Sequence, residues 1–138
     1  MKFSLVFLVV LFFGCRTVTR TVVEADCPLL KGFPRKITAL PFPSLEEIKA
    51  YNGSFIAVEG YFAYSFEDIA LYPKKVNHTG AYALWLDTVG PDSLYDKLKG
   101  KRVQAVGRVN IADKGHDNGY MATLDSVFCV TEVAPFNR

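Results

Sequence analysis

Two stretches decide the fold: SFIAVEGYFAY at residues 54–64 and KRVQAVGRVNI at residues 101–111. In both, apolar residues recur at every second position, which predicts strands with one buried face. Gly60 and Gly107 interrupt this alternation near its middle, where a strand can bend or bulge. The two stretches also match each other at a spacing of 47 residues. The match indicates an internal duplication or a chance similarity of two helix–glycine–strand junctions. In either case, two long strands with central glycines are what a sheet needs to curl into a small barrel.

Shorter elements flank these two strands. Ser44 and Glu47 have the spacing of a capping box, which starts a helix. The strand expected at residues 81–87 places Tyr82, Leu84 and Leu86 on one face. The full set of expected elements is an edge strand at 37–40, a helix from 45 to about 51, strands at 54–64, 68–72 and 81–87, a helix at 92–98, and strands at 101–111 and 120–133.

This order of strands and helices resembles the OB-fold, a five-stranded, partly open Greek-key barrel, over about residues 54–133. We therefore expect a mainly β protein, with a small five-stranded OB-like Greek-key barrel and one or two short helices in a domain at residues 36–138. Four short motifs are also similar to uncharacterised bacterial envelope lipoproteins with an OB-like domain. They are GSFIAVEG at 53–60, ALWLD at 83–87, GKRVQAVG at 100–107 and KGH at 114–116. That likeness implies no activity.

The first residues have the pattern of an export signal. Lys2 precedes the apolar run FSLVFLVVLFF at residues 3–13, whose length fits a secretory signal peptide. The segment LFFGC at 11–15 resembles the lipobox of bacterial lipoproteins, with Phe12 in place of the usual leucine. This resemblance implies a signal peptide at 1–14, lipidation of Cys15 and a tether at 15–35. Cleavage after Ala25, or an uncleaved N-terminal anchor, are the alternatives.

Lipidation would place the protein in the bacterial cell envelope, with the membrane as its first partner. Arg16 follows Cys15 where many inner-membrane lipoproteins carry aspartate, which favours the periplasmic side of the outer membrane. Export also delivers the chain to an oxidising compartment, where paired thiols form disulfides. A disulfide between Cys27 and Cys129 is therefore expected, the alternative being two unrelated buried thiols.

Composition excludes several classes of protein. Half of the 138 residues are apolar, which argues against disorder, and no apolar run reaches the length of a membrane-spanning helix. The formal net charge of +2 argues against nucleic acid as the partner. The two histidines, His78 and His116, have no zinc-ligand spacing, and Gly115 replaces a ligand position in the calcium-like loop at 113–119. We expect no metal and no cofactor.

The remaining candidate site is an aromatic one. OB-folds bind ligands on the outer face of their second and third strands, where Tyr72 and Trp85 are expected, with Tyr61 beside them and His116 in the last loop. Such rings stack on flat ligands, or pack under a loop as ordinary structural residues. The sequence thus predicts a non-catalytic module for a small ligand or an envelope protein. The alternatives are a small periplasmic hydrolase using His116 with a nearby carboxylate, and a structural accessory of an envelope complex.

Overall fold

The computed structural model describes residues 21–24, 36–75, 80–88 and 92–133. Within these ranges the elements are β1 (Thr21–Glu24), β2 (Lys36–Leu40), α1 (Leu45–Lys49), β3 (Phe55–Ser65), β4 (Asp68–Tyr72), β5 (Leu84–Thr88), α2 (Asp92–Leu98), β6 (Arg102–Asn110) and β7 (Ala122–Glu132). Two 3-10 turns, η1 (Gly80–Tyr82) and η2 (His116–Asn118), precede β5 and β7. Among the described residues, none of the helices combines the length and apolar character that crossing a bilayer requires.

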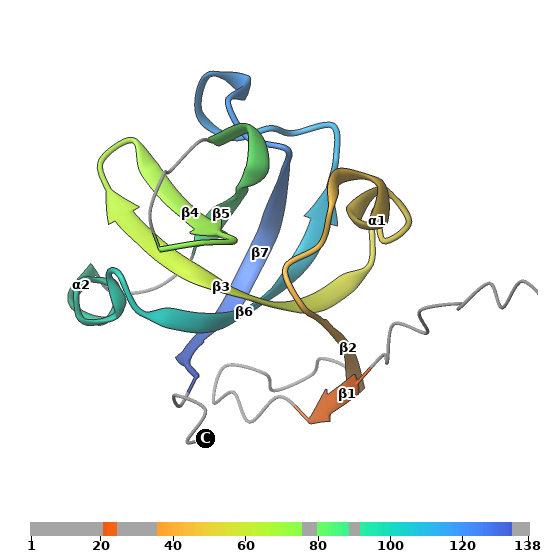
Figure 1. The fold of residues 1–138 in the computed structure, drawn as a ribbon, viewed down its shortest axis with the longest axis horizontal. Helices are drawn as coiled ribbons and strands as arrows, with labels where there is room; N and C mark the ends of the chain where they lie inside the picture. Colours follow the sequence, from red (N-terminus) through yellow and green to blue (C-terminus); the bar gives the residue numbers. More distant parts are fainter. Residues whose placement is uncertain (1–20, 25–35, 76–79, 89–91, 134–138) are drawn as a thin grey trace, which may run out of the picture.

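Strands β3 to β7 close into a five-stranded barrel. β3 pairs with β4 and β4 with β5, both antiparallel, and β5 then pairs with β7 in parallel. β7 pairs with β6, and β6 returns to β3, so the sheet has no free edge along this circuit. A barrel of this strand order, with α2 between its third and fourth strands, is OB-like, and Figure 1 shows α2 at one side of it. The predicted fold is confirmed.

The barrel interior is filled by the alternating apolar residues that the sequence pattern picked out. On β3, for example, Ile56, Val58 and Phe62 are each at most 1% exposed. Burial of such side chains is the main term that stabilises a small domain. The core comprises Leu40, Ile48, Ile56, Val58, Phe62, Leu71, Leu84, Leu86, Tyr95, Leu98, Val103, Ala105, Val109, Met121, Ala122, Leu124, Val127 and Val130.

The two stretches that match in sequence also occupy matching positions in the barrel. The Gly53 N–H donates to the carbonyl of Val109, and the Gly100 N–H donates to the carbonyl of Phe62, each at 2.8 Å. Both glycines have positive φ, 78° and 73°, and each ends the turn between a short helix and its strand. Figure 1 shows the two helices on opposite sides of the barrel. The glycine of each helix–glycine–strand unit is therefore hydrogen-bonded to the strand of the other unit, and the β3–β6 pair joins the two units.

The central glycines, where the sequence predicted a bend or bulge, lie at close approaches to neighbouring segments. A Cβ atom on Gly60 would lie 3.0 Å from the Tyr72 carbonyl oxygen and 3.1 Å from Cδ2 of Phe42. A Cβ atom on Gly107 would lie 3.0 Å from Val127. The β6–β7 register also shifts between Val106 and Arg108, where β7 bulges at Ser126, whose φ is 51°. These irregularities supply the curvature that closes a small barrel.

The N-terminal part of the domain lies on the outside of the barrel. β2 pairs in parallel with β3, and β1, a strand that the sequence did not predict, pairs with the other side of β2. The prediction of β2 as an edge strand was therefore wrong, because β1 covers it. Against the barrel, Ile37 joins a small apolar cluster with Ala57, Val106 and Cys129.

Cys129, 8% exposed, forms a disulfide bond in this outer cluster. Its predicted partner, Cys27, lies outside the described residues, as does Cys15. The Cys27–Cys129 pairing and the lipidation of Cys15 stay predictions. The predicted signal peptide and most of the predicted tether also lie outside the described residues.

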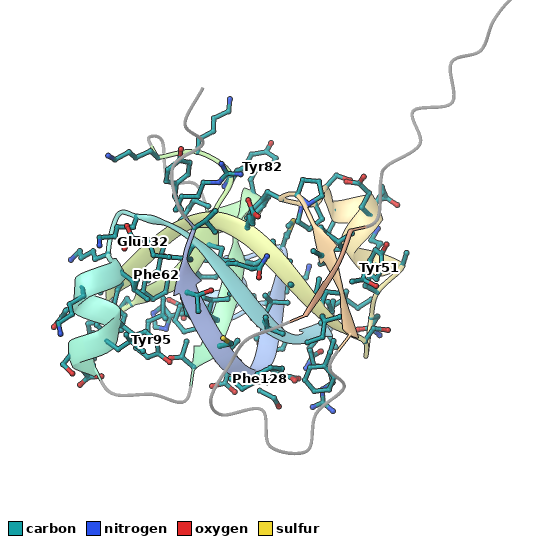
Figure 2. All side chains as sticks on the ribbon, turned by 90° about the horizontal axis from the view of Figure 1, so that it is seen from below. Tyr51, Phe62, Tyr82, Tyr95, Phe128 and Glu132 are labelled. Carbon is teal, nitrogen blue, oxygen red and sulfur yellow. The ribbon has the colours of Figure 1, made fainter. Side chains whose placement is uncertain are left out.

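Two apolar residues are placed differently from the expectation. Tyr82 was expected on a strand, on the same face as Leu84 and Leu86, but β5 begins only at Leu84. Tyr82 lies in η1 and is 69% exposed. A helix from 45 to about 51 was expected to place Leu45 on one face with Ile48 and Tyr51, but α1 contains only five residues, and Leu45 is 45% exposed while Ile48 is buried. Figure 2 shows Tyr82 at the periphery of the molecule, at the edge of the view opposite to Phe128.

Candidate functional site

The structure brings three of the predicted site residues together on the outer face of the barrel. Tyr61 on β3 pairs directly with Tyr72 on β4. Trp85 on β5 pairs with Ala70 of β4, and Ala70 in turn pairs with Ala63 of β3. The two alanines and Trp85 belong to one packed apolar cluster. The parity of the strands therefore predicted the position of these rings correctly.

The loop between β6 and β7 folds over this face. Tyr120 at the end of the loop packs on Trp85 with ring centroids 5.1 Å apart, and His116 stacks on Trp85 at 6.5 Å. Gly115 lies so close to the indole that a Cβ atom there would be 2.5 Å from Cγ of Trp85. We call Tyr72, Trp85 and Tyr120, with their neighbours Ala63, Ala70 and Ala83, the loop-covered cluster.

Side-chain hydrogen bonds fix the conformation of this loop. The Asn110 Oδ1 atom accepts from the backbone N–H groups of Ala112 and Asp113, at 3.1 and 3.2 Å. The Asp113 carboxylate then accepts from the Gly115 N–H at 2.9 Å. Asn and Asp are frequent in such turns because their short side chains hold the following backbone in place. Asp113 is therefore a turn residue here.

A carboxylate satisfies the tyrosine hydroxyls of the cluster. Tyr72 and Tyr120 both donate to Oδ1 of Asp68, each at 2.9 Å. Burial raises the pKa of both tyrosines, and the Asp68 carboxylate raises it further, for Tyr120 to about 12. Tyr72 is 4% and Tyr120 8% exposed. Tyr72 is thus packed under the loop residue Tyr120, as the structural alternative predicted, and the ligand-binding role of Tyr61, Tyr72, Trp85 and His116 stays a prediction.

A different part of the barrel surface is open and apolar. At the end where β4 stops and β5 and β7 begin, there is a pocket of about 360 Å³. We call it the apolar pocket. The described residues that line it are uncharged: Phe42, Pro43, Ser44, Leu45, Pro73, Ala81, Tyr82 and Met121.

Local structure explains why these residues meet. The Ser44 hydroxyl accepts from the Glu47 N–H and the Glu47 carboxylate accepts from the Ser44 N–H, which fixes the chain as it enters α1. Phe42, just before this cap, packs on the bare backbone of Gly60. Across the pocket, Pro73 ends β4 and η1 presents Tyr82. The pocket is thus assembled from residues at the ends of elements.

This pocket was not predicted, because its residues were assigned to elements or to the breaks between them. Tyr82 was expected within a strand, on the face of Leu84, and the strand expected at 68–72 ends just before Pro73. The available signal was an excess of apolar and proline residues directly at element ends, where solvated turns usually carry polar ones.

His116, the residue of the hydrolase alternative, lies beside a carboxylate, and that alternative stays a prediction. His116, with its side chain 46% exposed, stacks on Trp85, and its Nε2 atom lies 3.3 Å from the carboxylate of Asp117. Among the described residues, no three or more His, Cys, Asp or Glu side chains are grouped so that they could hold a metal ion. Asp125, another carboxylate near this loop, is paired with Arg108 at 2.8 Å, and it raises the pKa of that guanidinium.

No protein-family model, no curated protein and no solved structure matches this chain.

Proposed function

We propose that this chain is a lipid-anchored bacterial envelope protein whose OB-like barrel is a non-catalytic binding module. The binding site is the apolar pocket, and its ligand is an apolar or aromatic group carried by a small molecule or by another envelope protein. The observation that carries this proposal is an open pocket of about 360 Å³ that exposes Leu45 and Tyr82 at the end of a rigid barrel.

The size and lining of the pocket support a binding role. Ligand pockets are mostly apolar and range from roughly 300 to 1,000 Å³. At about 360 Å³ the apolar pocket lies near the lower limit and suits one ring or one short apolar chain. The Tyr82 hydroxyl and the Ser44 side chain are the polar groups near its rim. Burying the exposed parts of Tyr82 and Leu45 against a ligand is favourable because it removes apolar area from water.

The sequence before the barrel supports the location. Gly14 and Cys15 follow an apolar run of signal-peptide length and have the order of a lipobox. Two or more acyl chains hold a protein stably on a bilayer, whereas one gives only reversible binding. Lipidation of Cys15 would thus keep the barrel beside a membrane, on the periplasmic side of the outer membrane by the argument from Arg16.

The pocket is tested with the dye 8-anilinonaphthalene-1-sulfonate, which fluoresces on exposed apolar sites. We expect the native chain to bind the dye, and Tyr82→Asp to abolish most of the fluorescence while the thermal midpoint is unchanged. Leu94→Asp is the matched control, because Leu94 is 44% exposed on α2 and does not line the pocket. Equal fluorescence from native protein and Tyr82→Asp would refute the pocket as the site.

The anchor is tested separately by metabolic labelling with a fatty-acid analogue. The native chain should be labelled and sediment with membranes, and Cys15→Ser should lose both properties. Cys27→Ser serves as a second control, since it removes a cysteine near the same end of the chain without touching the lipobox. Labelling that survives in Cys15→Ser would exclude the anchor.

A further inference from the structure

Phe66 is the most exposed large apolar side chain among the described residues, at 97%. It lies at the tip of the β3–β4 hairpin, where Ser65 pairs with Asp68. A single exposed apolar ring is common on protein surfaces, but one held on a hydrogen-bonded turn is presented to other molecules in a fixed position. This ring is therefore a candidate for contact with another molecule.

The support under Phe66 is rigid. Asp68, two residues on, accepts the hydroxyls of Tyr72 and Tyr120, each at 2.9 Å. The Tyr120 hydroxyl also donates to the backbone carbonyl of Glu67, at 3.4 Å. These hydrogen bonds from the loop-covered cluster fix the backbone of the hairpin tip. Little conformational entropy is therefore lost when the ring docks.

The surroundings of Phe66 on its own chain leave the ring uncovered. A hollow of about 390 Å³ beside it, between the hairpin and α2, is lined by both charges, Asp96 and Lys99. The apolar pocket lies beyond the other end of β4, at Pro73. The seven-residue separation along an extended strand corresponds to roughly 20 Å, so Phe66 cannot reach the pocket of its own chain.

We infer that the apolar pocket of one chain receives Phe66 of a second copy, in a head-to-tail contact. This inference rests on the proposed function of the pocket and names its partner. A cavity of about 150 Å³ is enough to bind a benzene ring. The apolar pocket, at about 360 Å³, therefore has room for a phenyl ring and its adjoining backbone between Phe42, Tyr82 and Met121.

One charge next to the ring in sequence, Glu67, is complementary to one at the pocket, Lys74. Glu67, exposed, follows Phe66, and Lys74, exposed, follows Pro73 at the rim of the pocket. The acidic residues of the neighbouring helix have partners within their own chain. Glu46 pairs with Lys49 at 2.9 Å, and the Glu47 carboxylate caps α1. A second copy that inserts Phe66 thus brings Glu67 toward Lys74.

Head-to-tail contacts use two different surfaces, so each chain keeps one free ring and one free pocket. One ring in one pocket gives weak association in dilute solution. Chains that are anchored on one membrane meet at a much higher effective concentration, which favours the contact there.

The test replaces Phe66 of the full chain by the photoreactive analogue p-benzoyl-phenylalanine, and membranes or concentrated purified protein are irradiated. We expect covalent dimers whose cross-link maps to residues of the apolar pocket, with Met121 as the main site. The same analogue at Thr131, which is exposed on β7, should give no such dimer. Lys74→Glu should lower the yield about threefold, and the added Glu67→Lys should restore it.

A complementation experiment is a second test, and it remains informative if one variant folds poorly. The Phe66→Asp chain keeps an intact pocket, and the Tyr82→Asp chain keeps the residue-66 ring, here replaced by the analogue. Neither chain should form cross-linked dimers alone. A mixture of the two should form them, because the analogue of the second chain can enter the pocket of the first. No dimer, a cross-link outside the pocket, or a cross-link to a different protein would overturn the inference. If the dye binds the pocket normally in the same preparation, the proposed function stands and only the partner is wrong.

Discussion

Two groups of aromatic residues on the outer surface of this barrel differ in whether another part of the chain covers them. In the loop-covered cluster, Tyr72 and Tyr120 give their hydroxyls to Asp68 and lie under a loop. At the apolar pocket, Tyr82 is 69% exposed and no part of the described chain packs over it. Aromatic residues on an OB-like face are therefore available for binding only where the connecting loops leave them exposed. Substitutions in the cluster should therefore change stability, and substitutions at the pocket should change binding alone.

The largest effect is expected from Gly115→Ala. The new Cβ atom would lie 2.5 Å from Cγ of Trp85, at a φ of 65° that residues other than glycine adopt with strain. Strain and overpacking together should lower the free energy of unfolding by about 2–4 kcal/mol. Chemical denaturation followed by tryptophan fluorescence measures this, because Trp85 is the single tryptophan.

Gly100→Ala is the control for a positive φ without a steric contact; the ψ of −156° at Gly115 adds backbone strain of its own. Gly100 has a similar φ of 73°, but a Cβ atom there would meet nothing within 4 Å. This variant should lower the free energy of unfolding only by the backbone cost of a positive φ, about 1–2 kcal/mol. Equal losses in the two variants would mean that contact between the loop and Trp85 adds nothing to stability.

The next effect concerns alkaline pH. A tyrosine in the unfolded chain has a pKa of about 10, whereas the pKa of Tyr120 in the folded chain is raised to about 12 and that of Tyr72 is also raised. Above pH 10 the unfolded state therefore binds fewer protons than the folded state. The stabilisation is complete below pH 10 and is lost as the pH rises from about 10 to about 12.

Tyr120→Phe separates the hydroxyl from the ring. It removes one hydrogen bond to Asp68, which still accepts from Tyr72, and should cost about 1 kcal/mol at neutral pH. It should also flatten the decline of stability above pH 10. Tyr82→Phe is the control for loss of a tyrosine hydroxyl outside the cluster, because this side chain is 69% exposed. Parallel pH profiles for the native chain and Tyr120→Phe would contradict the role given to Asp68.

The sequence pattern predicted the barrel because its information is local. The alternation around Gly60 and Gly107 identifies β3 and β6, and the strand expected at 68–72 matches β4 residue for residue. Capping of α1 by Ser44 and Glu47 was also predicted, since a capping box lies within four consecutive residues.

The candidate site could be predicted only in part, because it depends on contacts between distant segments. Strand parity placed Tyr72 and Trp85 on the outer face, but their cover comes from Gly115 and Tyr120, much later in the chain. The apolar pocket was missed for a similar reason. Its residues gain a common surface only after the ends of β4, β5 and β7 come together, and no periodicity marks such a meeting.

A smaller effect, of opposite sign, is expected from Thr123→Val. Thr123 pairs with Trp85 across the β5–β7 ladder, is fully buried, and its hydroxyl has no hydrogen-bond partner among the described residues. Removing an unsatisfied buried hydroxyl while keeping the shape is neutral or stabilising, here by at most about 1 kcal/mol. Thermal unfolding measures it. A loss of stability would indicate that this hydroxyl is hydrogen-bonded, and the cluster would then be more polar than described.

The smallest stability effect is expected at the pocket itself. Tyr82→Ala removes a ring that is 69% exposed, and surface substitutions of this kind change the free energy of unfolding by no more than about 0.5 kcal/mol. Denaturation midpoints of the native chain and Tyr82→Ala measure this change, and Tyr72→Ala is the contrasting variant, since its ring is buried in the cluster. A loss at Tyr82 comparable to that at Tyr72 would show that the ring supports the barrel. An unchanged midpoint, together with lost dye binding, would assign the ring to recognition, because the ring would then contribute to binding and not to folding.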